Sequence, residues 1–84
     1  MPRPDVRVIN ASGQAVTVTV RGAGAAATRR LGVDRVWAVP QAFPGGALHF
    51  EVALPGRPEV RTALASPRLP LRVAIAQDGR VAPR

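Results

Sequence analysis

The side chains that could support hydrolysis are few and scattered along the sequence. His49 is the only histidine, and the two serines, Ser12 and Ser66, stand in turn-like segments. Neither serine lies in the Gly-x-Ser-x-Gly pattern that presents a nucleophile on a sharp turn. The aspartates that could orient the imidazole of a triad are Asp5, Asp34 and Asp78. Because a triad is defined by geometry and not by the presence of its residue types, we expect no catalytic residue and a protein that is not an enzyme.

Metal and phosphate chemistry have equally little support. His49 and Glu51 are two residues apart and share one face of a strand, so they supply two ligands, whereas zinc in a structural site takes four. There is no cysteine to add a thiolate. The segment Gly22–Gly24 lacks the Lys-Ser/Thr pair that follows a phosphate-binding loop. We therefore expect no metal, no cofactor and no small-molecule substrate.

Charge is the unusual property of this sequence. Twelve arginines and no lysine stand against five acidic residues, which gives a net charge of +7. Such an excess raises the affinity for nucleic acid, for anionic membranes and for acidic proteins. The alternative interpretation is a solvated basic surface that keeps a valine-rich domain soluble.

Four arginines fall on the polar side of alternating segments: Arg7, Arg21, Arg61 and Arg72. If the strands that carry them are neighbours, their guanidinium groups form one basic sheet face, which can bind an acidic protein or follow a phosphate backbone. Phe43, in the proline-flanked segment QAFPGG, is the one ring expected to be partly exposed, and we add it to the predicted binding residues. The alternative for Phe43 is a plug that closes one end of a sandwich.

Two classes of partner compete for such a face. Proteins that bind single-stranded nucleic acid on β-folds present stacking rings, but this chain has only Trp37, Phe43 and Phe50, and the core needs at least two of them. We therefore predict a noncatalytic interaction or assembly module that presents an Arg/Thr-rich face or an edge strand to an acidic or self partner. Val6–Ile9 and Val81 are the expected edges, available for homodimer or filament assembly. A nucleic-acid-binding small β-barrel is the alternative.

The elements that must position these residues are short strands. Twelve valines against six leucines favour strands, and apolar residues alternate with polar ones in most segments. The expected strands are Asp5–Asn10, Ala15–Arg21, Thr28–Leu31, Val33–Val39, Ala47–Leu54, Glu59–Ala65, Leu71–Gln77 and Arg80–Ala82. Turn signals recur every 8–12 residues or so, which predicts a small antiparallel β-sandwich, immunoglobulin-like, of about seven strands, with a small β-barrel as second choice.

The links between the segments give further expectations. The first two strands should form a hairpin across the turn Ala11–Gln14, and Gly22–Ala27 should be a loop. Asp78-Gly79 predicts a two-residue type I′ turn. Trp37 should point inward, which puts Arg35 on the core side unless a bulge or an edge position releases it.

Two segments carry a resemblance to known families. VRVINASGQAVTVTV and ALHFEVALPG resemble the first hairpin and a later strand of bacterial immunoglobulin-like or transthyretin-like modules. The chain has no cysteine pair and no tyrosine for a tyrosine corner. Those modules are mostly spacers, adhesion elements or assembly subunits, so the resemblance implies a binding role.

The length of the chain and the composition of its segments predict its domain organisation and its location. Eighty-four residues form one domain, 1–84, with Met1–Pro4 as a disordered lead-in. No apolar run approaches the roughly 18 residues of a membrane span. The first ten residues lack the apolar segment of a signal peptide, so a cytoplasmic location is the default expectation.

Overall fold

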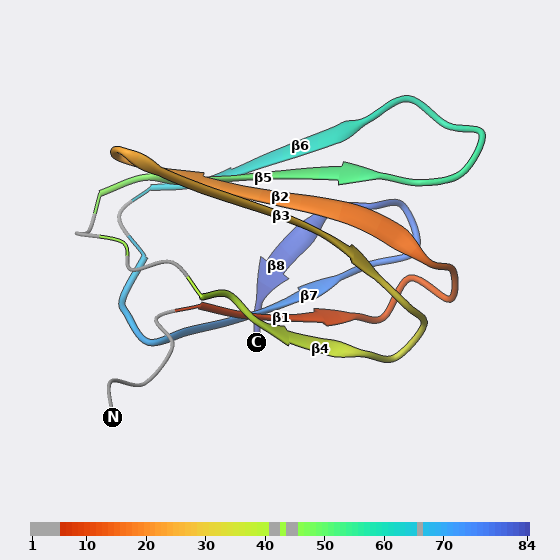
Figure 1. Cartoon of the computed structure of the whole chain (residues 1–84), viewed down its shortest axis with the longest axis horizontal. Coiled ribbons are helices and arrows are strands. Elements are labelled where there is room, and N and C mark those ends of the chain that lie inside the picture. Colours follow the sequence, from red (N-terminus) through yellow and green to blue (C-terminus); the bar gives the residue numbers. More distant parts are fainter. Residues whose placement is uncertain (1–5, 41–42, 44–45, 66) are drawn as a thin grey trace.

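The protein is an eight-stranded β-sandwich without a helix, as a computed structural model shows for residues 6–40, 43, 46–65 and 67–84 (Figure 1). The predicted all-β sandwich is confirmed, while the predicted lead-in lies outside the described residues. The strands are β1 Val6–Asn10, β2 Val16–Gly22, β3 Ala25–Leu31, β4 Val36–Ala38, β5 Leu48–Ala53, β6 Val60–Leu64, β7 Leu71–Ile75 and β8 Val81–Pro83.

The strands form two layers of four. Sheet A has the order β4-β1-β7-β8, and sheet B has the order β3-β2-β5-β6. Neighbouring strands are antiparallel except β1 and β7, which run parallel with Arg7 beside Arg72. The antiparallel prediction is therefore wrong for this pair, because a long stretch of chain separates the two strands and no hairpin fixes their direction. The strand order also differs from that of an immunoglobulin domain. With strands lettered A to G along the chain, the two sheets of that domain are ABED and CFG.

The first predicted hairpin is wrong. β1 and β2 lie in different sheets, and β2 pairs instead with β3 through the two-residue turn Ala23–Gly24. The predicted loop Gly22–Ala27 is mostly strand, because Gly24 takes the positive φ of 70° that a tight turn needs and the alanines then pair with β2. A five-residue link after Asn10 is long enough to carry the chain across the roughly 10 Å between packed sheets.

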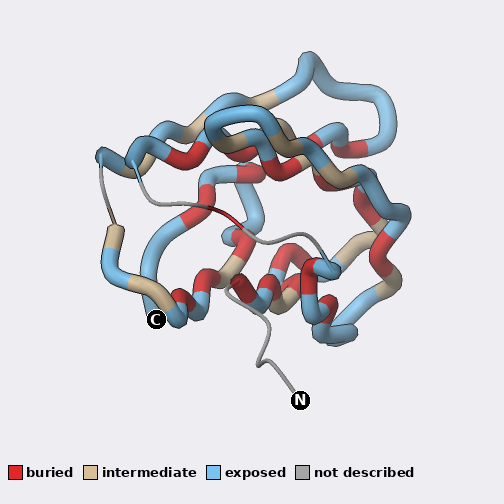
Figure 2. The backbone as a smooth tube through the Cα atoms, turned by 60° about the vertical axis from the view of Figure 1, so that its left-hand side comes forward, coloured by how far each residue is buried: buried red, intermediate tan, exposed pale blue. Residues whose placement is uncertain are grey.

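The core lies between the sheets, and the strand backbones alternate between buried and exposed residues (Figure 2). Sheet B contributes Val16, Val18, Val20, Leu31, Leu48, Phe50, Val52 and Leu54 to it. Sheet A, together with the residue just after β4, contributes Val6, Val8, Trp37, Val39, Leu71, Val73, Ile75 and Val81. The predicted inward faces of Ala15–Arg21, Ala47–Leu54 and Leu71–Gln77 are confirmed, since period-2 alternation places alternate side chains on one face.

A bulge before β4 explains the position of Arg35. The amide of Asp34 donates to the carbonyl of Asn10 at 3.0 Å, and the amide of Asn10 donates to the carbonyl of Arg35 at 3.0 Å. Asp34 and Arg35 thus both lie opposite Asn10, which defines a β-bulge, and Asp34 has the left-handed φ of 60°. The extra residue shifts the alternation, so that Arg35 is exposed while Trp37 is buried. The predicted bulge is confirmed.

The chain turns between β7 and β8 at Gln77, Asp78 and Gly79, with Ala76 and Arg80 paired on either side. The amide of Gly79 donates to the carbonyl of Ala76 at 2.9 Å, and the amide of Ala76 donates to the carbonyl of Arg80 at 2.8 Å. Gly79 alone has a positive φ, 88°, in this loop. The hairpin is confirmed, but the two-residue type I′ turn is wrong, because this pattern is a type I turn followed by a glycine bulge.

Asn10 holds one end of the sandwich together from a fully buried position. Its side-chain Nδ2 donates to the backbone carbonyls of Gln14 at 2.6 Å, Leu31 at 3.1 Å and Gly32 at 3.1 Å. Its carbonyl oxygen accepts from the amide and the hydroxyl of Ser12. The single side chain therefore connects the end of β1, the turn before β2 and the end of β3.

Gly22 is required because Phe43 packs against it. A Cβ at position 22 would lie 2.5 Å from Cδ1 of Phe43 and 3.1 Å from Cδ2 of Leu48. We expect Gly22→Ala to lower the free energy of unfolding by about 1–3 kcal/mol, since overpacking forces side chains from their rotamers. Urea denaturation measures this change. In the Phe43→Ala background the same substitution should cost less than about 1 kcal/mol, because contacting residues are not additive; an equal cost in both backgrounds would contradict the contact.

Candidate functional site

The four predicted arginines do not form one face. Arg7 on β1 and Arg72 on β7 lie on the outer face of sheet A, whereas Arg21 on β2 and Arg61 on β6 lie on the outer face of sheet B. The prediction of a single basic face is therefore wrong. Alternation assigned each side chain to the polar side of its own strand, but it cannot show which sheet a strand joins.

The outer face of sheet A carries two cross-strand rows, and we call it the arginine face. In the first row Ala38, Arg7 and Arg72 are direct neighbours, and Arg84 lies opposite Arg72, whose carbonyl accepts from the amide of Arg84 at 2.8 Å. The second row consists of Val36, Ile9, Ala74 and Ala82. A row of guanidinium groups thus runs beside a row of apolar side chains.

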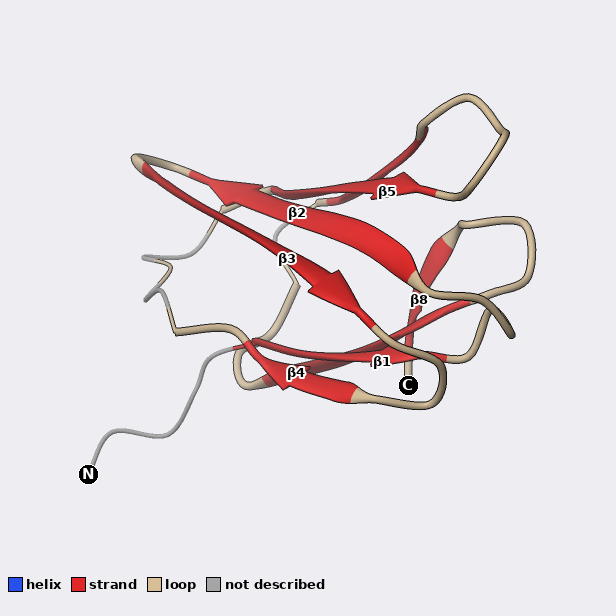
Figure 3. Ribbon diagram, turned by 45° about the vertical axis from the view of Figure 1, so that its right-hand side comes forward, coloured by secondary structure: helices blue, strands red, loops and turns tan. Residues whose placement is uncertain are grey.

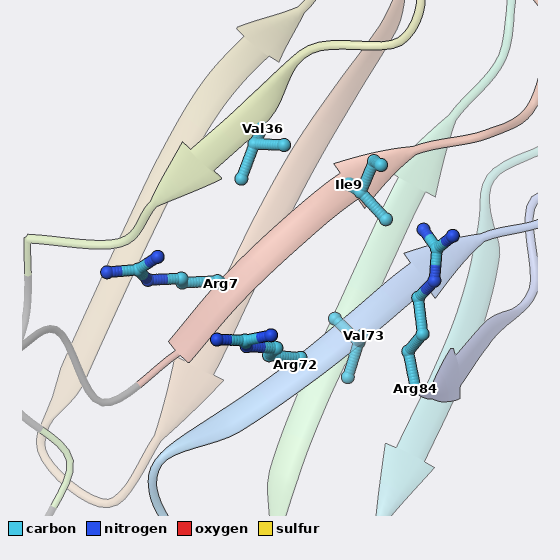
Figure 4. A pocket seen from close by; sticks show the side chains of 6 residues that line it. All are labelled: Arg7, Ile9, Val36, Arg72, Val73 and Arg84. Carbon is cyan, nitrogen blue, oxygen red and sulfur yellow. The ribbon is translucent and has the colours of Figure 1, made fainter.

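The arginine face contains a groove of about 420 Å³, and the residues that line it are Arg7, Ile9, Val36, Arg72, Val73 and Arg84. Figure 4 shows Arg7 and Arg72 extending in the same direction, while Arg84 points from the end of β8 toward Ile9. Val36 is 59% exposed and lies directly beside Ile9 in the apolar row. The groove therefore offers both charge and apolar contact to a partner.

The arginines of this face have no acidic partner among the described residues. The three ion pairs in the described part of the chain join Arg21 to Glu51, Arg61 to Glu59 and Arg80 to Asp78. None of them includes an arginine of this face. Like charges on neighbouring strands repel and destabilise a sheet by roughly 0.2–1 kcal/mol per pair. An anion bound between Arg7, Arg72 and Arg84 would relieve this repulsion.

On the outer face of sheet B, by contrast, two arginines have acidic partners. Nε of Arg21 donates to Oε1 of Glu51, and Nε of Arg61 donates to Oε1 of Glu59 at 3.2 Å. Glu51 lies directly opposite Arg61 in the neighbouring strand β6. The hydrogen bond from Arg21 lowers the pKa of Glu51 against a smaller opposing effect of burial. Arg21 and Arg61 therefore have their counterions on this face.

The lowered pKa of Glu51 predicts an acid-dependent contribution to stability. A carboxyl whose folded-state pKa lies below its ordinary value of 4.5 stabilises the fold above that value and loses this effect as the pH falls through the folded-state pKa. We expect Glu51→Gln to be slightly less stable than the unmodified protein at pH 7 and equally stable near pH 2. Thermal unfolding across this range measures the difference. Arg21→Ala should behave in the same way, and a pH-independent difference would contradict the interaction.

Phe43 does not belong to a binding surface. It is only 4% exposed and packs in the core with Leu48. The prediction of a partly exposed ring is wrong, and the alternative of a plug is what the structure shows. Trp37 and Phe50 are buried too, so none of these three rings offers a stacking surface.

The candidate catalytic residues are dispersed. Ser12 is buried, and its hydroxyl is bound to Asn10 and to the carbonyl of Gln14, whereas His49 is exposed on the far side of β5. Asp34 lies in the bulge before β4, and Asp78 accepts from the amide of Arg80 in the turn after β7. Ser66 and Asp5 lie outside the described residues. Within the described part of the chain, no group of three or more His, Cys, Asp or Glu residues is placed to hold a metal ion.

Sequence reasoning missed Arg84, Ile9 and Val36 as parts of the face. Ile9 carried a usable signal, because it stands on the same side of its segment as Arg7. Val36 carried a signal too, because it stands on the side of its segment opposite to the inward Trp37. Arg84 joins the row only because β8 pairs with β7 in this register.

In comparisons with known proteins, no family model, no curated protein and no solved structure matches the chain. In the residues that the structure describes, no helix is long and apolar enough to cross a membrane.

Proposed function

We propose that this protein is a noncatalytic interaction module that binds an acidic protein segment on the arginine face. The observation that carries the proposal is the row Arg7, Arg72 and Arg84, which lacks an acidic neighbour among the described residues. Arginine pairs with carboxylates through two parallel hydrogen bonds, which gives both affinity and orientation.

The adjacent apolar row favours a protein partner over nucleic acid. Ile9 and Val36, which is 59% exposed, can contact apolar side chains that stand next to acidic residues in a peptide. A nucleic acid would instead gain from stacking rings, and Trp37, Phe43 and Phe50 are all buried. The partner is therefore an acidic segment that also carries apolar residues.

The test uses a peptide of alternating glutamate and leucine, titrated calorimetrically at low and moderate salt. We expect binding that weakens with salt, because screening reduces contacts between exposed charges. Arg7→Ala/Arg72→Ala should lower the affinity by about tenfold or more, since hydrogen bonds between charged groups are the strong ones.

The matched control is Arg21→Ala/Arg61→Ala, which removes the same charge from the outer face of sheet B. It should lower the affinity by less than about threefold if only the general field is lost. Equal losses in both double variants, or no binding at low salt, would contradict the proposal. Tighter binding of random RNA or DNA oligonucleotides, lost in Arg7→Ala/Arg72→Ala, would assign the face to nucleic acid and overturn it.

A further inference from the structure

A second surface of the molecule is the free edge of β3. This strand spans seven residues, Ala25–Leu31, and each of them pairs with β2 on one side only (Figure 3). It contains no proline and no bulge, two of the features that blunt a sheet edge, and its only charged residues are Arg29 and Arg30. Its outer backbone groups are therefore available along a regular strand.

The geometry of the β2–β3 hairpin identifies these groups. The two-residue turn makes Gly22 and Ala25 a hydrogen-bonded pair, and hydrogen-bonded and non-hydrogen-bonded pairs then alternate along the ladder. The hydroxyls of Thr19 and Thr28 lie 2.9 Å apart, as expected for a pair whose side chains approach closely. The amides and carbonyls of Ala26, Thr28 and Arg30 therefore point away from β2.

The other edges of the sandwich are less suitable. β4 and β8 have three residues each, and β8 ends in Pro83. Along β6, the hydroxyl of Thr62 already accepts from the amide of Val81 at 3.2 Å. The edge of β1 that the sequence predicted does not exist, because β1 lies between β4 and β7, whereas Val81 does lie on the edge strand β8.

Charge selects the occupant of the β3 edge. Arg29 and Arg30 are exposed, point to opposite faces of sheet B, and take part in none of the ion pairs found in the described chain. A second copy would bring four guanidinium groups onto one continuous sheet, and two chains of net charge +7 repel each other. An acidic strand would place carboxylates opposite both arginines.

We propose that the β3 edge binds an extended acidic segment by antiparallel strand addition. Two consecutive acidic residues lie opposite Arg30 and Arg29, one on each face of the sheet. Small or β-branched residues lie opposite Thr28 and the alanines before it. Main-chain hydrogen bonds supply affinity, and the two charge pairs supply direction and register. This surface is separate from the arginine face and does not depend on it.

The probe is the blocked peptide Thr-Glu-Glu-Thr-Val-Thr-Val, whose glutamates align with Arg30 and Arg29 in antiparallel pairing. Amide exchange followed by NMR in the complex should show slower exchange at Ala26, Thr28 and Arg30. Exchange at Ala27 and Arg29 should not change, because β2 already occupies those amides. Purely electrostatic binding would not produce this alternation. A peptide with both glutamates replaced by lysine should bind about tenfold more weakly, since two favourable charge pairs become unfavourable.

Thr28→Pro tests the backbone contact directly. It removes an outward N–H without breaking a bond to β2, a position at which edge strands tolerate proline, and it should weaken binding of the peptide by about tenfold or more. Thr28→Ala, which also loses the contact with Thr19 but keeps the N–H, is the control and should retain binding. A probe N-methylated at its central threonine tests the same bond without altering the protein.

Three results would overturn this proposal: uniform or absent protection along β3, unchanged affinity of both Thr28→Pro and the methylated peptide, or concentration-dependent dimerisation of the protein alone with protection at the same three amides. The last result would assign the edge to a second copy. Arg7→Ala/Arg72→Ala should leave this binding unchanged, so failure of the arginine face and failure of the β3 edge are distinguished.

Discussion

Replacing Asn10 with alanine is expected to lower the free energy of unfolding by about 3–4 kcal/mol, because each buried polar group left without a partner costs roughly 1–3 kcal/mol. The substitution removes the donor for three carbonyls and the acceptor for the amide and hydroxyl of Ser12. A domain of this size is stable by only about 4–13 kcal/mol. The melting temperature should therefore fall by more than about 12 °C, as measured by circular dichroism.

The variant Asn10→Asp separates the hydrogen bonds from the shape of this side chain. A carboxylate at position 10 would face the carbonyls of Gln14, Leu31 and Gly32 without a proton to donate. Its pKa in the folded state should rise, so the native state binds more protons than the unfolded state and stability increases as the pH falls.

We expect Asn10→Asp to be as unstable as Asn10→Ala at pH 7 and more stable than it in acid. The exposed substitution Thr17→Ala is the control, with an effect within about 0.5 kcal/mol. A difference between Asn10→Asp and Asn10→Ala that does not vary with pH would contradict the role of the amide as a donor.

Reversing the charge of Arg72 is expected to change binding and stability in opposite directions. Arg72 is central to the arginine row, with Arg7 on one side and Arg84 on the other. Arg72→Glu should weaken binding of the glutamate–leucine peptide by about 10–100-fold, since it removes a charged contact and adds repulsion. It should also raise the free energy of unfolding by about 1 kcal/mol at low salt, because two repulsive cross-strand pairs become attractive.

Salt provides the control for this prediction. The gain in stability of Arg72→Glu should shrink toward zero as the salt concentration rises and screening shortens the range of exposed charges. Arg61→Glu, which places a third carboxylate beside Glu59 and Glu51, should instead lower stability and leave binding nearly unchanged. A loss of stability in Arg72→Glu would show that the three arginines are not in mutual repulsion.

Local pattern was sufficient for most of the secondary structure. Period-2 alternation predicted the buried sides of Val16–Val20, Leu48–Leu54 and Leu71–Ile75, and all three are confirmed. It also indicated that Trp37 is buried and that either a bulge or an edge position releases Arg35; the structure has the bulge, and β4 is an edge strand as well. These features depend on neighbours in sequence, since the pleat alone decides which way successive side chains point.

The pairing of strands could not be predicted in this way. Asn10 is the last residue of a predicted strand, and the chain crosses to the other sheet directly after it. Its side chain donates to the carbonyls of Leu31 and Gly32, which are more than twenty residues away in the sequence. The parallel contact of β1 with β7 joins residues further apart still. Long-range contacts of this kind have no local signal.

The sequence by itself determined an all-β sandwich, a strongly basic surface and the polar side on which Arg7, Arg21, Arg61 and Arg72 lie. Only the tertiary structure decided that these four divide between two sheets, that Arg84 completes the row on one of them, and that Phe43 is buried. The physical reason is that alternation fixes the direction of a side chain relative to its own strand, whereas sheet order and register decide which charges become neighbours. The proposed binding on the arginine face depends on those neighbours.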